Sequence, residues 1–144
     1  MRNNPIERAY LAGFIDGEGC ISITGSRQAY GKTMKMAPTI SVANTNFDVL
    51  EWAKSKTQLG IIRPRPKPNS PKKDSFELDF RVDEIIPLLD LVDEFLIVKK
   101  RQAELMRQFF RVKGGQSNTA PTLEVYTERL RVMYEIQSLN KKGK

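Results

Sequence analysis

Alternating apolar and polar residues predict four β-strands, arranged as two pairs. The first pair covers residues 21 to 24 and 39 to 43, with a connection over residues 25 to 33. The second pair covers residues 61 to 67 and 75 to 81. Because only alternate side chains in these segments are apolar, each strand is expected to bury one face and expose the other.

Helical spacing of apolar residues predicts five helices. The first has a start signal, in which Asn4 suits the N-cap, Pro5 the first helical position and Glu7 the acidic position of a capping box. The second should end just before Gly60. The predicted helices cover residues 5 to 17, 46 to 59, 83 to 92, 97 to 113 and 122 to 139. The order α-β-β-α-β-β-α, followed by two further helices, indicates an α+β fold.

Small residues recur every four positions on one face of the first predicted helix. Ala9, Gly13 and Gly17 leave this face almost without side chains. Such a face usually lets two helices pack with their backbones close together, which requires a symmetric partner or an internal copy of the helix. A tight contact between this helix and the predicted sheet is the alternative.

Two acids lie where the first helix gives way to a strand. Asp16 falls in the last helical turn, where a carboxylate commonly accepts hydrogen bonds from nearby backbone amides. Glu18 lies between Gly17 and Gly19, and helix propensity gives no reason for an acid there. Glu18 should therefore be displayed where a basic sheet begins. A calcium-binding EF-hand is excluded because no ladder of Asp or Asn follows Asp16.

The amino-acid composition restricts both the class of binding partner and the class of catalytic site. The 144 residues carry 24 Lys and Arg against 17 Asp and Glu, a net charge of +7, which favours an anionic partner such as nucleic acid. The absence of His excludes Ser-His-Asp and Cys-His nucleophiles and HExxH metalloproteases. A single Cys, and acids that interrupt the apolar start of the chain, predict a soluble intracellular protein without a membrane partner. The cytoplasm of a prokaryote and an organelle are both compatible with these features.

The charges are segregated along the chain. Residues 19 to 44 and 61 to 73 carry Lys and Arg but no acid, whereas residues 83 to 95 carry acids but no base. This distribution predicts one basic face and a separate, solvated acidic face.

The segment from Leu11 to Gly19, LAGFIDGEG, resembles the signature of the LAGLIDADG homing endonucleases. It departs from that signature mainly by Gly17 in place of Ala and Glu18 in place of Asp. The predicted order of elements is similar to the family core. The resemblance implies one LAGLIDADG endonuclease domain over residues 1–144, with an αββαββα core at about 4–113, an antiparallel DNA-binding sheet and extra C-terminal helices, the last at about 122–139.

One copy of the motif is present, because the nearest second candidate, residues 88 to 96, lacks its glycines. In this family a single motif implies a homodimer whose motif helices pack along the twofold axis. Two Glu18 carboxylates would then meet beneath the centre of a DNA duplex. The interface residues implied by the resemblance are Ala9, Ala12, Gly13, Asp16 and Gly17.

The implied activity is site-specific hydrolysis of both DNA strands near the centre of a long pseudo-palindromic target, as in intron or intein homing. Two carboxylates facing phosphate need a divalent cation, and Mg²⁺ suits because water and phosphate complete its coordination. By resemblance, Glu18 and the Gly17 carbonyl hold this ion, with Mn²⁺ as a substitute and Ca²⁺ supporting binding without cleavage. Lys99 would supply a catalytic cation, or else belong to a solvated helical turn. Asn44 would position water, or else cap the second helix.

DNA recognition is expected from the polar face of the sheet, because a two-stranded ribbon fits the major groove and Arg pairs with guanine. Arg63, Arg65 and Lys67 alternate with prolines and should point the same way. Glu77 and Asp79 would repel phosphates, so they should accept from cytosine or lie outside the contact zone. The expected set is Ser22, Thr24, Ser26, Arg27, Gln28, Tyr30, Lys32, Lys35, Thr39, Ser41, Arg63, Arg65, Lys67, Lys73, Glu77 and Asp79.

Two other functions are compatible with the sequence. The family also includes intron-RNA maturases, and the fold can serve a regulator that binds DNA without cleaving it. A retained Glu18 in both half-sites favours cleavage, whereas tighter binding to intron RNA than to any duplex would favour a maturase. A basic ribosomal-type protein is disfavoured because it gives no reason for the acid and the glycines of the motif.

Overall fold

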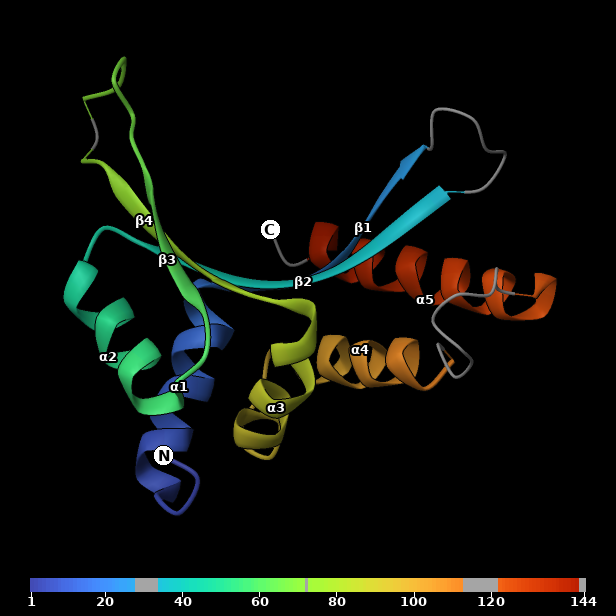
Figure 1. Ribbon diagram of the computed structural model, residues 1–144, viewed down its shortest axis with the longest axis horizontal. Coiled ribbons are helices and arrows are strands. Elements are labelled where there is room, and N and C mark those ends of the chain that lie inside the picture. Colours follow the sequence, from blue (N-terminus) through green and yellow to red (C-terminus); the bar gives the residue numbers. More distant parts are fainter. Residues whose placement is uncertain (28–33, 72, 113–121, 143–144) are drawn as a thin grey trace. The chain divides into compact units, whose positions relative to one another are not determined.

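The computed structural model describes residues 1–27, 34–71, 73–112 and 122–142 (Figure 1). Its elements are α1 (Pro5–Glu18), β1 (Gly19–Arg27), β2 (Met34–Asn44), α2 (Phe47–Thr57), β3 (Ile61–Arg65), β4 (Ser75–Phe80), α3 (Val82–Val92), α4 (Lys100–Val112) and α5 (Leu123–Lys142). The strands of this part of the chain form one sheet in the order β1-β2-β4-β3. The α+β class and the predicted order of elements are confirmed.

The chain divides into two compact units. We call Met1–Cys20 with Thr39–Lys100 the motif unit, and Ile21–Pro38 with Arg101–Lys144 the C-terminal unit. The motif unit holds α1, α2, α3, β3 and β4, whereas the C-terminal unit holds α5 and nearly all of α4. β1 and β2 each pass from one unit to the other.

In the motif unit, β4 pairs antiparallel with both β2 and β3. Ile40 lies opposite Phe80 in the β2–β4 pair, and Ile61 lies opposite Asp79 in the β3–β4 pair. Helices α1, α2 and α3 lie on one side of these strands (Figure 1). The buried apolar residues of the unit include Leu11, Ala12, Ile15, Ile40, Val42, Leu50, Ala53, Leu78, Ile85, Leu88, Leu89 and Val92.

Helix α1 begins as predicted but ends later. The Oδ1 of Asn4 accepts from the Glu7 N–H at 3.1 Å, so Asn4 is the N-cap. The Glu7 carboxylate does not complete a capping box; it forms an ion pair with Lys56 at 2.9 Å instead. The helix continues to Glu18 because the Gly19 N–H still donates into the last turn.

Helix α2 ends two residues before its predicted end. The Thr57 hydroxyl donates to the Ala53 carbonyl at 2.8 Å and accepts from the Leu59 N–H at 3.1 Å, which turns the chain out of the helix. Gln58 adopts the left-handed conformation with φ 61°, and Gly60 follows with φ 93°. The side chain of a polar residue, rather than glycine alone, therefore determines this end.

Other boundaries differ from prediction by a few residues. β1 and β2 extend further toward their connection, and β3 and β4 end earlier. Helix α4 begins at Lys100 instead of residue 97 because the preceding amides are bound by a distant side chain, described below. None of the described helices is long and apolar enough to span a membrane.

In the C-terminal unit, α5 is joined to β1 by side-chain amides. Gln137 Nε2 donates to the Ile23 carbonyl at 2.8 Å, and Asn140 Nδ2 donates to the Ile21 carbonyl at 3.0 Å. The buried apolar residues of this unit are Ile21, Ile23, Ala103, Leu105, Met106, Phe109, Val132, Met133 and Ile136.

Candidate functional site

Glu18 lies at the junction of α1 and β1, with its side chain exposed. Beside it is a hollow of about 350 Å³, called the Glu18 hollow below, which is lined by Glu18, Ala43, Asn44, Thr45, Lys67 and Ser75. The end of β2 supplies Asn44, and the connection from β3 to β4 supplies Lys67. The fold of the motif unit thus brings together Glu18 and Asn44, which the sequence predicts for catalysis, and Lys67, which it predicts for DNA contact, although the three are far apart in the chain.

Asn44 lines this hollow and does not cap α2. The N-cap of α2 is Asn46, whose Oδ1 accepts from the Val49 N–H at 3.2 Å. The Oδ1 of Asn44 accepts from the Asn46 N–H at 2.8 Å, which fixes the orientation of the Asn44 amide. Helix capping by Asn44 is therefore wrong, and its part in catalysis stays a prediction.

The Asp16 carboxylate binds the segment that precedes α4. Its Oδ2 accepts from the N–H groups of Ile97 at 2.8 Å and Val98 at 3.2 Å, and its Oδ1 accepts from the Lys99 N–H at 3.0 Å. These charge-assisted bonds use both oxygens and hold residues 97 to 99 out of the helix. Asp16 is a structural acceptor, as predicted, but its donors lie 81 to 83 residues away and not in its own turn.

Lys99 is bound to the end of α1. Its Nζ donates to the Asp16 carbonyl at 2.7 Å, and the residue is half-buried. A cation at this position stabilises the carbonyl end of the helix, where the helix dipole is negative. Lys99 is not among the residues that line the Glu18 hollow, and its catalytic role stays a prediction.

On the outer face of β3 and β4, two arginines form ion pairs with two acids. Arg63 Nε lies 3.3 Å from Asp79 Oδ2, and Arg65 Nη1 pairs with Glu77 Oε2. Each Arg reaches the acid diagonal to it, since the residue directly opposite Arg63 is Glu77. The sequence predicts that Glu77 and Asp79 accept from cytosine or lie outside the contact zone. It does not predict that these acids neutralise Arg63 and Arg65 within the chain. Lys67, predicted to align with the arginines, lies beyond the end of β3.

Glu77 and Asp79 are also coupled to each other. The hydrogen bond between their side chains, together with partial burial and repulsion from the Asp79 charge, raises the pKa of Glu77 above its ordinary value, although Arg65 acts to lower it. Glu77 therefore keeps its proton to a higher pH than a free carboxyl does, and the protonated form presents less negative charge to an approaching anion.

The described residues among the rest of the set predicted to contact nucleic acid lie on β1, on β2 and between β3 and β4. Thr24 is exposed, and its hydroxyl donates to the Ala37 carbonyl at 3.3 Å. The described members of this group are Ser22, Thr24, Ser26, Lys35, Thr39, Ser41 and Lys73. Arg27 ends β1, but its side chain lies outside the described part of the chain, as do Gln28, Tyr30 and Lys32.

The small-residue face of α1 is open. Ala9, Gly13 and Gly17 are exposed, and a Cβ added at either glycine would meet no atom of the described residues within 4 Å. A tight contact between this face and the sheet is therefore wrong for the described part of the chain. Ala12, predicted in the same interface, is fully buried in the core of the motif unit and cannot lie on this face.

Two large apolar side chains extend the open face of α1 and were not predicted. Ile6 is 81% exposed and Tyr10 is 59% exposed, and both line a hollow of about 480 Å³ beside α2. The Tyr10 ring packs edge-on against Trp52, with 5.1 Å between ring centroids. Their helical spacing from Ala9 and Gly13 is the sequence signal that identifies them.

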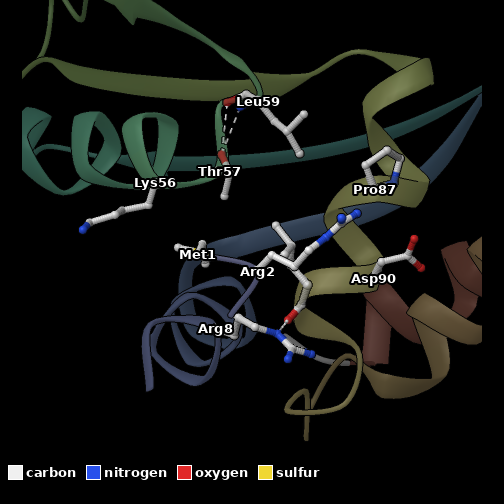
Figure 2. A pocket seen from close by; sticks show the side chains of 9 residues that line it. Met1, Arg2, Arg8, Lys56, Thr57, Leu59, Pro87 and Asp90 are labelled. Atoms are coloured by element: carbon white, nitrogen blue, oxygen red, sulfur yellow. Dashed lines mark hydrogen bonds between the residues drawn. The ribbon is translucent and has the colours of Figure 1, made fainter. Parts of the chain in front are cut away.

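A further hollow of about 510 Å³ is lined by the start of the chain, α1, the end of α2 and α3 (Figure 2). Two of its cations have partners within the described chain. Arg8 donates to the Leu91 carbonyl at 2.8 Å and pairs with Glu94 at 3.0 Å, and Lys56 pairs with Glu7. None of the residues predicted to act in function lines this hollow, so we assign Arg8 and Lys56 a structural role.

The sequence matches the model of one protein family, described as LAGLIDADG endonuclease, over residues 11–107. No curated protein sequence matches the chain. The fold is similar to that of an archaeal intron-encoded homing endonuclease, I-Vdi141I, in complex with DNA, with 22% identity, a TM-score of 0.77, and coverage of 93% of this chain and 84% of that chain.

Two other solved structures are similar. The homing endonuclease I-CvuI in complex with the I-CreI target has 19% identity and a TM-score of 0.76, covering 93% of this chain and 82% of that chain. The homing endonuclease I-TnaI has 22% identity and a TM-score of 0.66, covering 98% of this chain and 96% of that chain. At these identities the likeness establishes a shared fold.

Proposed function

Because the chain belongs to the LAGLIDADG endonuclease family, we propose that it is a homing endonuclease that hydrolyses both strands of a DNA duplex at one specific site. The observation that carries this proposal is the Glu18 hollow, where an exposed acid, an amide and a lysine meet. The I-Vdi141I and I-CvuI structures contain DNA, which supports a nucleic-acid substrate. We propose that residues 1–144 act as one endonuclease domain.

The proposed reaction depends on a divalent cation. Glu18 and the Gly17 carbonyl would hold it, with Mg²⁺ as the expected ion, Mn²⁺ as a substitute and Ca²⁺ supporting binding alone. One exposed carboxylate fits such an ion because Mg²⁺ takes most of its ligands from water and phosphate. No cluster of three metal-binding side chains occurs in the described part of one chain, so the remaining ligands would be water, DNA phosphate or groups of a second copy. When bound, the ion lowers the pKa of the attacking water and stabilises charge on the phosphate.

The protein's own residues orient the reacting groups. Glu18 projects from the last turn of α1, which Asp16 and Lys99 fasten to the segment before α4. The Asn44 amide is oriented by its bond to the Asn46 N–H, and its nitrogen is proposed to hold a water in the hollow. These contacts keep the acid and the amide in place before DNA binds, which is the condition for electrostatic preorganisation.

Arg63 and Arg65 are proposed to read DNA from a two-stranded ribbon in the major groove. Binding would require each to exchange its acid for a base edge or a phosphate. The arginine side chains in these ion pairs are 65% and 59% exposed. Such exposed pairs contribute only about 0–1 kcal/mol. A good bidentate contact to a base contributes about 1–3 kcal/mol, so the exchange favours the bound state.

The active form is proposed to be a homodimer. The chain carries one motif and hence one Glu18, whereas cleavage of two strands needs a catalytic acid for each. A Cβ added at Gly13 or Gly17 would meet no described residue within 4 Å, and Ile6 and Tyr10 extend the open face of α1 with apolar surface. These features support close packing of α1 against its counterpart in a second copy.

Plasmid cleavage tests the proposed function. The uninterrupted DNA that flanks the gene supplies the target, and wild type with Mg²⁺ should linearise a plasmid that carries it. Glu18→Gln should bind the duplex in Ca²⁺ as tightly as wild type, or more tightly, because one repulsive charge is removed. Its cleavage should fall by several orders of magnitude, since the ion loses its ligand. Near-normal cleavage by this variant would contradict the mechanism, and tighter binding to intron RNA than to any duplex would indicate a maturase.

A further inference from the structure

Lys67 lies in the same hollow as the proposed metal-binding acid. We propose that its ammonium group binds the backbone phosphate at the cleavage site and that Lys67 is a further catalytic residue, an inference that rests on the proposed endonuclease function. The sequence predicts Lys67 only as one of three cations on a DNA-facing strand. Its place beyond β3 and beside Glu18 gives it a different task.

The backbone at Lys67 is held on both sides. Its N–H donates to Asp74 Oδ1 at 2.9 Å, which closes the connection between β3 and β4. Its carbonyl accepts from the Ser70 N–H at 3.2 Å. Pro66 and Pro68 flank it and fix their own φ angles. The long side chain therefore starts from a defined point, while its flexible stem lets the ammonium group adjust to a substrate.

Three other cations expected near the DNA have partners within the motif unit. Arg63 and Arg65 each form an ion pair with an acid of β4, and Lys99 donates to the carbonyl end of α1. Lys67 is exposed, and it forms no ion pair with any residue that the structure describes. Lys67 thus combines proximity to Glu18 with a charge that the chain does not neutralise.

The chemistry of hydrolysis explains why a phosphate is the ligand. As the bond from water to phosphorus forms and the bond to the 3′ oxygen breaks, negative charge grows on the non-bridging oxygens. Lys67 keeps its proton and donates a hydrogen bond to one of these oxygens. The proton of the water leaves to solvent, and the 3′ oxygen takes a proton from solvent. An ammonium group acts here as a point charge that needs no planar partner.

Single-turnover cleavage with saturating protein tests this role. Lys67→Ala should cleave about 10²-fold more slowly than wild type in Mg²⁺, because stabilisation of the transition state is lost. Lys67→Arg keeps the charge and should recover part of the rate. Lys141→Ala, which removes an exposed lysine of α5, is the matched control and should cleave like wild type. Thermal melting of each variant checks that it is folded.

A duplex in which one phosphate is replaced by an uncharged group locates the phosphate that Lys67 contacts. In Ca²⁺, Lys67→Ala should bind the target duplex more weakly than wild type. This difference should disappear when a methylphosphonate replaces the cleaved phosphate, and it should persist when the replacement is two nucleotides away. Cleavage by Lys67→Ala at the rate of Lys141→Ala, or a binding loss that persists on the first methylphosphonate duplex, would overturn the inference while the endonuclease function stands. Absence of cleavage by wild type would overturn the endonuclease function itself.

Discussion

Asp16 and Glu18 are acids separated by one glycine, yet their surroundings give them different tasks. Both oxygens of Asp16 accept backbone N–H groups, whereas Glu18 is exposed beside a hollow. The cause is the helical period, because two positions along an α-helix correspond to a rotation of about 200°. The two carboxylates therefore leave α1 on opposite sides, one toward the protein and one toward the proposed substrate.

Asp16→Asn should destabilise the protein. An amide in place of the carboxylate removes the charge and turns one acceptor into a donor that faces backbone N–H groups. Hydrogen bonds to charged groups contribute about 1.5–3 kcal/mol each, so we expect the free energy of unfolding to fall by about 2 kcal/mol or more. Urea denaturation measures this. The control is Asp48→Asn, an exposed acid in the first turn of α2. An equal loss in both variants would contradict the role assigned to Asp16.

The raised pKa of Glu77 predicts a pH-dependent contribution to stability. In the folded protein the hydrogen bond to Asp79 makes Glu77 hold its proton more tightly than the ordinary value of 4.5 implies. This stabilisation is complete below the unfolded pKa and is lost as the pH rises through the higher folded pKa. The free energy of unfolding of wild type, relative to Glu77→Gln, should therefore decrease from acid to neutral pH. A difference that stays constant in urea titrations across this range would show that the coupling to Asp79 has no effect.

Part of the Glu18 hollow was predictable from sequence. Glu18 follows from its motif and Asn44 from its place at the end of a strand. The position of Lys67 was not predictable, because it depends on how the β3–β4 connection folds. That fold is set by the bond between the Lys67 N–H and Asp74, which no periodicity reveals.

At the scale of elements, helix starts were predicted well where their signals are local. The Asn4 cap involves residues three positions apart, and it forms as expected. The start of α4 is set by Asp16 from 81 residues away, so a local pattern could not show that residues 97 to 99 lie outside the helix. Ala12 was assigned to the wrong face because one residue along a helix changes direction by about 100°.

The end of α2 contains two left-handed residues with opposite expected responses. Gln58 has φ 61°, so Gln58→Gly should raise the free energy of unfolding by about 0.5 kcal/mol. Gly60 has φ 93°, and a Cβ there would lie 2.7 Å from Leu78 Cδ1. Gly60→Ala should therefore lower the free energy of unfolding by about 1–3 kcal/mol. Urea denaturation of both variants measures these changes, and shifts in the same direction would contradict this account of the turn.

At the scale of the whole molecule, the open face of α1 predicts the oligomeric state. Wild type should have twice the chain mass of 16.5 kDa by light scattering, whereas Gly13→Leu should have the chain mass and should not cleave DNA. The variant should keep its circular dichroism, because a Cβ at position 13 meets no described atom within 4 Å. Ser138→Leu, at an exposed position of α5, is the control and should stay dimeric. A mass of 16.5 kDa for active wild type would rule the dimer out.

The two edge strands of the sheet, β1 and β3, carry features that hinder pairing with strands of other chains. At β1, the side-chain amides of Gln137 and Asn140 donate to the carbonyls of Ile23 and Ile21 respectively, and at β3 Pro64 has no N–H to donate. Unprotected strand edges are templates for strand addition and fibre growth. A protein that presents a sheet face to a long polyanion collects many copies side by side on it. These features disfavour strand addition at the sheet edges under such crowding, which leaves the proposed packing of α1 against its counterpart as the expected route of self-association.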